Sequence, residues 1–286
     1  MAKPAIRPSA GVARDAKHDP QPPLHALRRL WGRGEHVFLA VMLGVSFLAI
    51  WEYLAQHAII EPVLFPPPSK TAAAWWFLVR TEYFPRHFLV TLYEIGAGFA
   101  LGSTIGLLLG TLLATVRLVR LTLYPYIIAF QALPKVVLAP LFIVWFGFGP
   151  ESKIATAIAI CFFPVLVNTL VGLQLVEENA LKLLRSLRAT GWQTFVKVRL
   201  PNALPYIFAG LKTSLTFAMI GAIVAEFLTG AANGLGRLVQ IYNLQIQVHL
   251  ALAVVVIVSI LGLIGVVVMD AIDRRVIFWR DRSGGV

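Results

Sequence analysis

The residues of this chain that could serve chemistry or transport are ionisable side chains inside strongly apolar segments. Six stand out, and they are Glu52, Glu94, Lys135, Lys212, Glu226 and Asp270. A charge at membrane depth is costly unless it faces other protein groups or water, so each is a candidate for an ion or solute path. Glu52, Lys212 and Asp270 lie near the ends of their segments, where we expect them to extend to the membrane interface.

The deeper polar residues are the stronger path candidates. Lys135 directly follows Pro134, and a proline at that depth is expected to break the segment. Glu94 and Lys135 are candidates either for a structural pair or for the solute path. Glu226 precedes the glycine-containing run FLTGAANGLG and is a candidate for an external gate. Asn168, in a segment that the run FFP should kink, completes the set of path candidates.

Enzyme chemistry has little support in this sequence. The GxxxxGK[ST] pattern of a nucleotide-binding P-loop does not occur, so we expect the chain to bind no ATP itself. The six histidines show neither HxxxH nor HExxH spacing, and the one cysteine, Cys161, lies in an apolar stretch. We therefore expect no catalytic residue, no metal and no cofactor on this chain.

The composition indicates a polytopic membrane protein. Of the 286 residues 58% are hydrophobic and 14% are charged, whereas roughly a quarter are charged in ordinary soluble domains. A net charge of +11 would suggest nucleic acid as a partner of a soluble chain. Here most Lys and Arg residues lie in the tails and in alternate loops, which indicates membrane topology instead and places both termini in the cytoplasm. We therefore expect membrane lipid, and no nucleic acid, among the partners of this chain.

Six apolar segments are long enough to span a membrane, and the predicted fold class is all-α with six transmembrane helices. The segments run from about 36 to 58, 87 to 116, 121 to 146, 152 to 176, 204 to 228 and 249 to 272. A short external helix is expected over 235–243. The predicted organisation is a disordered basic cytoplasmic tail (1–36), a first span with an external proline-rich loop (37–83), a permease core (84–275) that includes a cytoplasmic loop (177–201), and a cytoplasmic tail (276–286).

A ridge of small residues marks the second segment. Gly98, Gly102, Gly106 and Gly110 recur at a strict four-residue step. Lipid gives helices no hydrophobic drive to associate, so close packing over small residues must supply it. The ridge therefore predicts close contact with another helix.

The stretch from Glu178 to Pro201 is polar and lies between two apolar segments. Leucines and basic residues alternate there at helical spacing, which predicts an amphipathic helix, a turn, and a second short helix that ends at Leu200-Pro201. The residues that define the two faces are Leu181, Leu184 and Leu187 on one and Lys182, Arg185 and Arg188 on the other. A simpler interpretation is an interfacial helix that touches only lipid headgroups.

This stretch resembles the cytoplasmic coupling loop of ABC importer permeases, whose motif is EAA, three residues, Gly, nine residues, Ile, any residue, Leu-Pro. Aligned on Leu200 and Pro201, the chain has Val198 at the Ile position and Arg188 at the Gly position, while the EAA head is absent. Gly191 is expected to supply the turn instead, and Trp192 to anchor the second helix. Other runs resemble the nitrate, sulfonate, taurine and pyrimidine-precursor group of these permeases, among them LFPPPSK, ALPKVVLAPLFIVWFGFG and IGAIVAEFLTGAANGLG.

The resemblance implies a type I ABC importer permease in a bacterial inner membrane. Its implied partners are a second permease copy, a dimer of cytoplasmic ATPases that hold ATP and Mg²⁺, and a periplasmic binding protein that delivers a small polar or anionic solute. The residues implied in coupling to the ATPase are Leu187, Arg188, Ala189, Gly191, Trp192, Val198, Leu200 and Pro201. Alternatives are an ion-coupled secondary transporter, a membrane enzyme, and an ABC-like assembly factor without transport.

Overall fold

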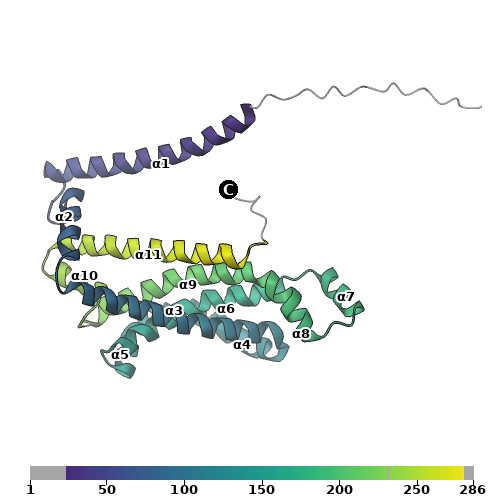
Figure 1. The fold of residues 1–286 in the computed structure, drawn as a ribbon. Coiled ribbons are helices and arrows are strands. Elements are labelled where there is room, and N and C mark those ends of the chain that lie inside the picture. Colours follow the sequence, from purple (N-terminus) through teal and green to yellow (C-terminus); the bar gives the residue numbers. More distant parts are fainter. Residues whose placement is uncertain (1–23, 231, 280–286) are drawn as a thin grey trace, which may run out of the picture. The chain divides into compact units, whose positions relative to one another are not determined.

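The computed structural model describes residues 24–230 and 232–279 (Figure 1). The chain divides into two units, Met1–Trp51 and Glu52–Val286. The described part of the first unit belongs to helix α1 (Leu24–Gln56), whose apolar portion Phe38–Gln56 is long enough to cross a membrane. The second unit holds all the sites below, and its described residues form helices joined by turns, without strands.

The described residues contain five helices that could span a membrane, or six if one bent pair counts as a span. This confirms the all-α class and the predicted break: α4 and the segment that follows it meet at 88° around Pro134. The elements of the second unit are α2 (Pro68–Val79), α3 (Phe84–Thr115), α4 (Arg117–Ala132), η1 (Lys135–Leu138), α5 (Ala139–Phe146), α6 (Pro150–Gln174), α7 (Glu178–Ser186), α8 (Gly191–Thr194), η2 (Phe195–Arg199), α9 (Leu200–Thr229), α10 (Leu235–Leu244) and α11 (Val248–Val276).

Helix α6 packs between α3 and α9, and these three helices form the centre of the unit (Figure 1). The glycine ridge of α3 faces α6: a Cβ on Gly98 would lie 2.5 Å from Ala157 Cβ, and one on Gly110 would lie 2.7 Å from Leu166 O. Two glycines that the ridge did not reveal, Gly172 and Gly210, hold α6 equally close to α9. The small side chains thus allow backbone-to-backbone contact, which packing inside lipid requires.

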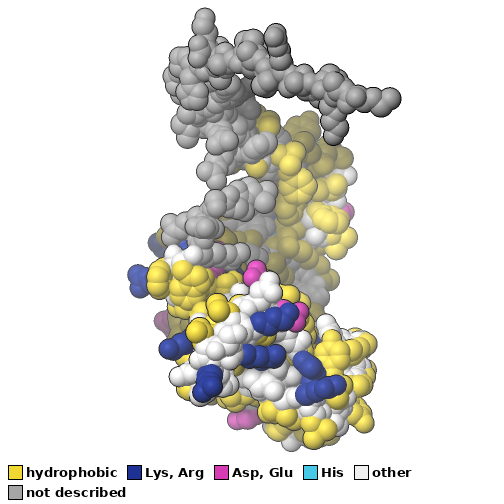
Figure 2. Space-filling model, turned by 90° about the vertical axis from the view of Figure 1, so that its right-hand side faces the viewer, with side chains coloured by type: hydrophobic (Ala, Val, Ile, Leu, Met, Phe, Trp, Pro, Cys, Tyr) yellow, Lys and Arg dark blue, Asp and Glu magenta, His cyan; other side chains and the backbone are white. Residues whose placement is uncertain are grey.

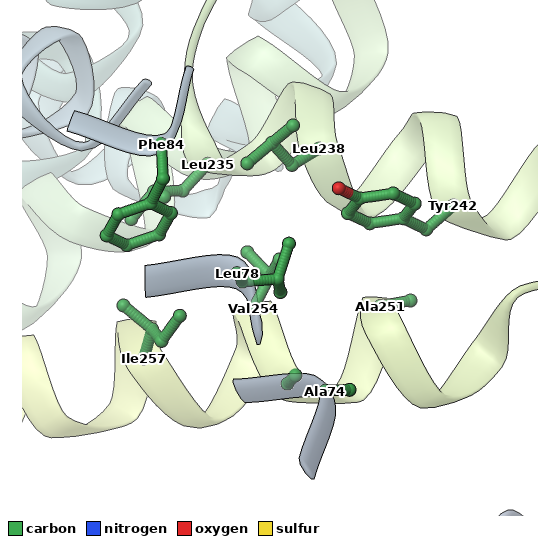
Figure 3. Packing of buried hydrophobic residues seen from close by; sticks show 10 residues of the cluster. Ala74, Leu78, Phe84, Leu235, Leu238, Tyr242, Ala251, Val254 and Ile257 are labelled. Carbon is green, nitrogen blue, oxygen red and sulfur yellow. The ribbon is translucent and has the colours of Figure 1, made fainter. Parts of the chain in front are cut away.

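The end of the bundle where α9 ends and α11 begins is closed by α2 and α10. Leu78 of α2, Leu238 of α10 and Val254 of α11 are buried against one another there (Figure 3). The hydroxyls of Tyr83 and Tyr242 lie 3.0 Å apart above this cluster. Burial and that neighbour raise the pKa of the Tyr242 hydroxyl. The short helix expected over 235–243 is confirmed as α10, and the apolar cluster fixes its position.

The loop at the opposite end of α9 differs from expectation in one respect. The second short helix does not end at Leu200-Pro201, because α8, η2 and α9 follow without a break. Pro201 lies in the first turn of α9, where a missing N–H is tolerated. The π-helical turn η2 precedes it, with Leu200 N–H bonded to Phe195 O five residues back. The loop is therefore joined to α9 by continuous helix.

Candidate functional site

The loop between α6 and α9 forms the first candidate site, which we call the loop surface: the exposed side chains of α7, of the turn over residues 187–190, and of α8 and η2. Leu187 is 69% exposed and Trp192 is 73% exposed. Figure 2 shows Lys and Arg side chains spread over this end, with hydrophobic side chains between and beside them. Exposed apolar side chains next to basic ones are typical of a protein-binding surface.

The turn inside the loop is made by Arg188 and not by Gly191. Arg188 has φ +53°, the left-handed conformation that glycine usually supplies at a helix C-terminus. Its N–H bonds to Arg185 O at 3.0 Å, and Ala189 N–H bonds to Leu184 O at 3.0 Å, which together make a Schellman motif. The expectation that Gly191 moves the turn is wrong, because Gly191 is already the first residue of α8.

The second half of the loop is held rigidly. Thr190 and Gln193 form a reciprocal capping box at the start of α8. Trp192 stacks on Phe195 with ring centroids 5.9 Å apart, and Phe195 packs against the buried cluster that includes Leu170 and Ala203. The Trp192 ring is thus supported on one side by the core of the bundle, while most of its surface remains exposed.

A buried polar cluster lies at the other end of α9, and we call it the acid cluster: Thr91, Glu94, Lys153 and Glu226. Glu94 is 1% exposed, Glu226 is fully buried and Lys153 is 2% exposed. Thr91 Oγ1 donates to Glu226 Oε1 at 2.6 Å, and Gly236 N–H donates to Glu226 Oε2 at 2.6 Å. Thr91 Oγ1 also accepts from Leu235 N–H at 2.7 Å. Glu226 and Thr91 therefore cap the N-terminus of α10.

Three further hydrogen bonds complete this end of the bundle. Gly234 N–H donates to His87 Nδ1 at 2.9 Å. Lys153 donates to Gly149 O at 2.8 Å and to Phe148 O. His87, Thr91 and Lys153 were missed by the sequence reasoning. A usable signal for the first two was present, since His87 and Thr91 lie eleven and seven residues before Gly98, about three and two helical turns, and therefore on the face of the glycine ridge.

The structure separates Glu94 from Lys135, so the predicted pair is wrong. Glu94 lies beside Glu226 and within electrostatic reach of Lys153. Lys135 instead donates to Gln131 O at 3.0 Å, and its ammonium lies 4.6 Å from the centroid of the Phe163 ring of α6. The 88° break after α4 explains this, because it turns Lys135 toward α6 and not toward α3.

Lys135 and Asn168 share a cavity of about 390 Å³, which Gln131, Phe163 and Phe217 also line. The cavity lies where η1 meets α6 and α9. The Asn168 amide donates to Pro164 O, one helical turn before it, at 2.8 Å. The four path candidates thus fall into two separate groups: Lys135 with Asn168, and Glu94 with Glu226.

Lys212 and Asp270, both expected to extend to the membrane interface, contact one another in the structure. Lys212 Nζ lies 2.6 Å from Asp270 Oδ1 and 2.6 Å from Asp273 Oδ2, which ties α9 to α11. Glu52 accepts hydrogen bonds from Ser69 N–H at 2.9 Å and Ser69 Oγ at 2.6 Å, at the start of α2. Across residues 24–230 and 232–279 no group of three or more His, Cys, Asp or Glu side chains is placed to hold a metal ion.

Comparisons with known proteins identify relatives over most of the chain. The sequence profile of the family described as "Binding-protein-dependent transport system inner membrane component" matches residues 102–278. The formylaminopyrimidine transport permease protein ThiX of Halalkalibacterium halodurans is 33% identical over 84% of this chain and 94% of its own length. The taurine transport system permease protein TauC of Escherichia coli is 28% identical over 90% and 95%.

A solved structure shares the fold. A chain from inward-facing conformations of the MetNI methionine ABC transporter superposes with a TM-score of 0.58 and 23% identity, over 68% of this chain and 96% of that one. At this level of identity the likeness concerns the fold alone.

Proposed function

The chain belongs to the binding-protein-dependent transport system inner membrane components, the permease family of ABC importers, and from this premise we propose that it forms the membrane path of an ATP-driven importer. The solute is a small polar or anionic molecule delivered by a periplasmic binding protein. A second permease copy completes the path, and a dimer of cytoplasmic ATPases supplies the energy. The absence of a P-loop motif from the sequence supports the assignment of ATP and Mg²⁺ to those separate subunits.

The observation that carries the proposal is the loop surface. Leu187 and Trp192 are exposed although the helices around them are well capped, so their exposure is not a consequence of poor folding. Arg188 stands between them in the chain and adds positive charge. We assign this surface to the ATPase, which covers the apolar side chains and places acidic groups against the basic ones.

The proposed coupling is mechanical. Continuous helix joins α8 through η2 to α9, and Phe195 anchors that junction in the core. When the ATPases close, they displace the loop surface, and α9 moves with it as a rigid element. Helix α9 has 30 residues, which at about 1.5 Å per residue spans roughly 45 Å, more than the roughly 30 Å hydrocarbon core. Motion at the loop is thereby carried to the acid cluster and α10.

The proposed orientation puts the loop surface in the cytoplasm, together with both termini, and α10 on the periplasmic side. The distribution of Lys and Arg along the sequence supports this orientation. Relatives named for formylaminopyrimidine and for taurine support a solute of the nitrate, sulfonate, taurine or pyrimidine-precursor kind. Both of these relatives are named for small polar molecules.

Ion-coupled secondary transport is the second candidate, and the buried pair Glu94 and Glu226 is the observation that favours it. Against it, both carboxylate oxygens of Glu226 are already bonded to Thr91 and to the N-terminus of α10. That arrangement suits a structural clamp better than an ion site.

The test is recruitment of the ATPase by variants of the loop surface. Leu187→Glu should abolish co-purification with the ATPase and the ATP hydrolysis stimulated by the binding protein, while leaving the permease folded in lipid discs. Leu244→Glu is the matched control for co-purification with the ATPase, since Leu244 is similarly exposed (74%) but lies in α10 at the opposite end of α9. Full recruitment by Leu187→Glu would remove the loop surface from coupling, and an ion gradient that drives uptake without any ATPase would favour the second candidate.

A further inference from the structure

The cavity at the break between α4 and η1 has the size of a small-molecule site. Its volume of about 390 Å³ lies within the roughly 300–1,000 Å³ of typical ligand pockets. It is lined by three parts of the fold: Gln131 and Lys135 at the break, Phe163 and Asn168 on α6, and Phe217 on α9. A broken helix whose irregular backbone borders a cavity is tolerated at membrane depth, and such breaks often mark solute sites.

Lys135 is the one charged residue that lines this cavity, and no carboxylate lines it. Lys212, by contrast, pairs with Asp270 and Asp273, and Lys153 is held by the carbonyls of Phe148 and Gly149, with Glu94 and Glu226 within electrostatic reach. Within the described part of the chain no carboxylate forms an ion pair with Lys135. Its protein contacts are one backbone carbonyl and the face of Phe163. An ammonium has three donors, so two remain available to a ligand.

An uncompensated ammonium inside a membrane protein is costly, and an anion bound beside it would offset that cost. The rest of the cavity wall suits a ligand with an apolar or aromatic body, because Phe163 and Phe217 line the same cavity. The Asn168 amide adds a polar contact, held in place by its hydrogen bond to Pro164 O. The complementary ligand therefore has one anionic head and a compact apolar or flat body.

We propose that the cavity around Lys135 is an anion subsite that binds a small organic sulfonate or carboxylate. The inference rests on the proposed transport function, which it deepens by placing charge selection for the solute in the permease. Lys135 pairs with the anionic head, Phe163 and Phe217 contact the body, and Asn168 accepts or donates a hydrogen bond at its edge.

The test measures binding to the purified full-length permease in phosphatidylcholine discs, without ATPase or binding protein. Benzenesulfonate is the probe, and benzenesulfonamide, its neutral analogue of similar shape, is the comparison. Benzenesulfonate should bind saturably and benzenesulfonamide at least about tenfold more weakly, because a charge-assisted contact is lost. Lys135→Gln should weaken benzenesulfonate binding by at least about tenfold, whereas Lys135→Arg, which keeps the charge, should retain it within about threefold.

Lys70→Gln is the matched control, since Lys70 is an exposed lysine on α2, and its binding should equal that of the wild type. Equal affinity for benzenesulfonate in wild type and Lys135→Gln, or equal affinity of the wild type for sulfonate and sulfonamide, would overturn the subsite. Displacement of the probe when phosphatidylglycerol replaces part of the phosphatidylcholine would assign Lys135 to a lipid headgroup and overturn it as well.

The outcome is separable from that of the transport proposal. A permease that recruits the ATPase through the loop surface but binds no sulfonate would remove the subsite alone. A permease that binds sulfonate through Lys135 but recruits no ATPase would remove the importer proposal and leave the subsite standing.

Discussion

Replacing Glu226 by alanine should release the N-terminus of α10 from the bundle. Glu226 Oε2 accepts from Gly236 N–H and Oε1 accepts from the Thr91 hydroxyl, each at 2.6 Å. Alanine removes both acceptors from a site that is fully buried. A buried donor without a partner costs about 1–3 kcal/mol, so the two donors together cost about 2–6 kcal/mol.

The lower half of that range is the better expectation. The Thr91 hydroxyl can rotate to a backbone carbonyl of its own helix, as helical threonines do, whereas Gly236 N–H at the first turn of α10 has no such choice. About 2 kcal/mol corresponds to roughly a thirtyfold change in the equilibrium between closed and open α10. The apolar contacts of Leu238 and Tyr242 should keep the helix docked for most of the time.

Amide hydrogen exchange of the full-length chain in lipid discs measures this opening directly. Protection of the peptide that covers α10 should fall about thirtyfold in Glu226→Ala, and by less in Glu226→Gln, which keeps one acceptor oxygen. Glu82→Ala is the control, because Glu82 is exposed just before α3. Unchanged protection of α10 in Glu226→Ala would refute the reasoning that Glu226 clamps this helix.

Two further predictions concern the backbone. Gly98→Ala should destabilise the chain by about 1–3 kcal/mol in thermal unfolding in detergent, because the new Cβ would lie 2.5 Å from Ala157 Cβ. Gly96→Ala is the control on the same helix: a Cβ there has no neighbour within 4 Å, so the change should be neutral or slightly stabilising. Equal effects of the two substitutions would contradict the packing argument. Arg188→Gly should relieve the left-handed backbone and so raise the protection of the Ala189 amide against hydrogen exchange by about 1 kcal/mol. Arg185→Gly, a glycine placed within α7, should lower that protection. A loss of protection in Arg188→Gly would contradict the assigned turn.

The spans, the helix break and the short helix α10 could be predicted from the sequence because their causes are local. Apolar length sets a span, and the break at Pro134 follows from its ring and missing donor. The order of leucine and basic residues predicted α7, and turn residues bounded α10. Each of these features depends on one continuous stretch of the chain, where the spacing of residues in the sequence sets their spacing along a helix.

The loop shows where local reasoning fails. Left-handed turns at helix ends prefer glycine, so the sequence predicted the turn at Gly191, yet Arg188 adopts the left-handed conformation. The last carbonyls of α7 accept hydrogen bonds from the N–H groups of Arg188 and Ala189, and this requires the left-handed turn at Arg188. Gly191 is not available for the turn, because the capping box of Thr190 makes it the first residue of α8. Proline tends to break helices, so the sequence predicted that the second short helix ends at Pro201. The π-helical turn before Pro201 instead lets the helix continue into α9.

The sequence alone determined that this chain is a helical membrane protein with a polar loop, and it identified the ionisable residues whose burial needs a reason. Only the tertiary structure decided their partners. Glu226 meets Thr91 from a position 135 residues away, Lys212 meets Asp273 from 61 residues away, and Lys135 meets the aromatic face of α6 with no acid beside it. The physical reason is that the packing of distant helices decides which groups lie next to an ionisable side chain, and that packing is set by glycine contacts and helix bends far from the side chain itself.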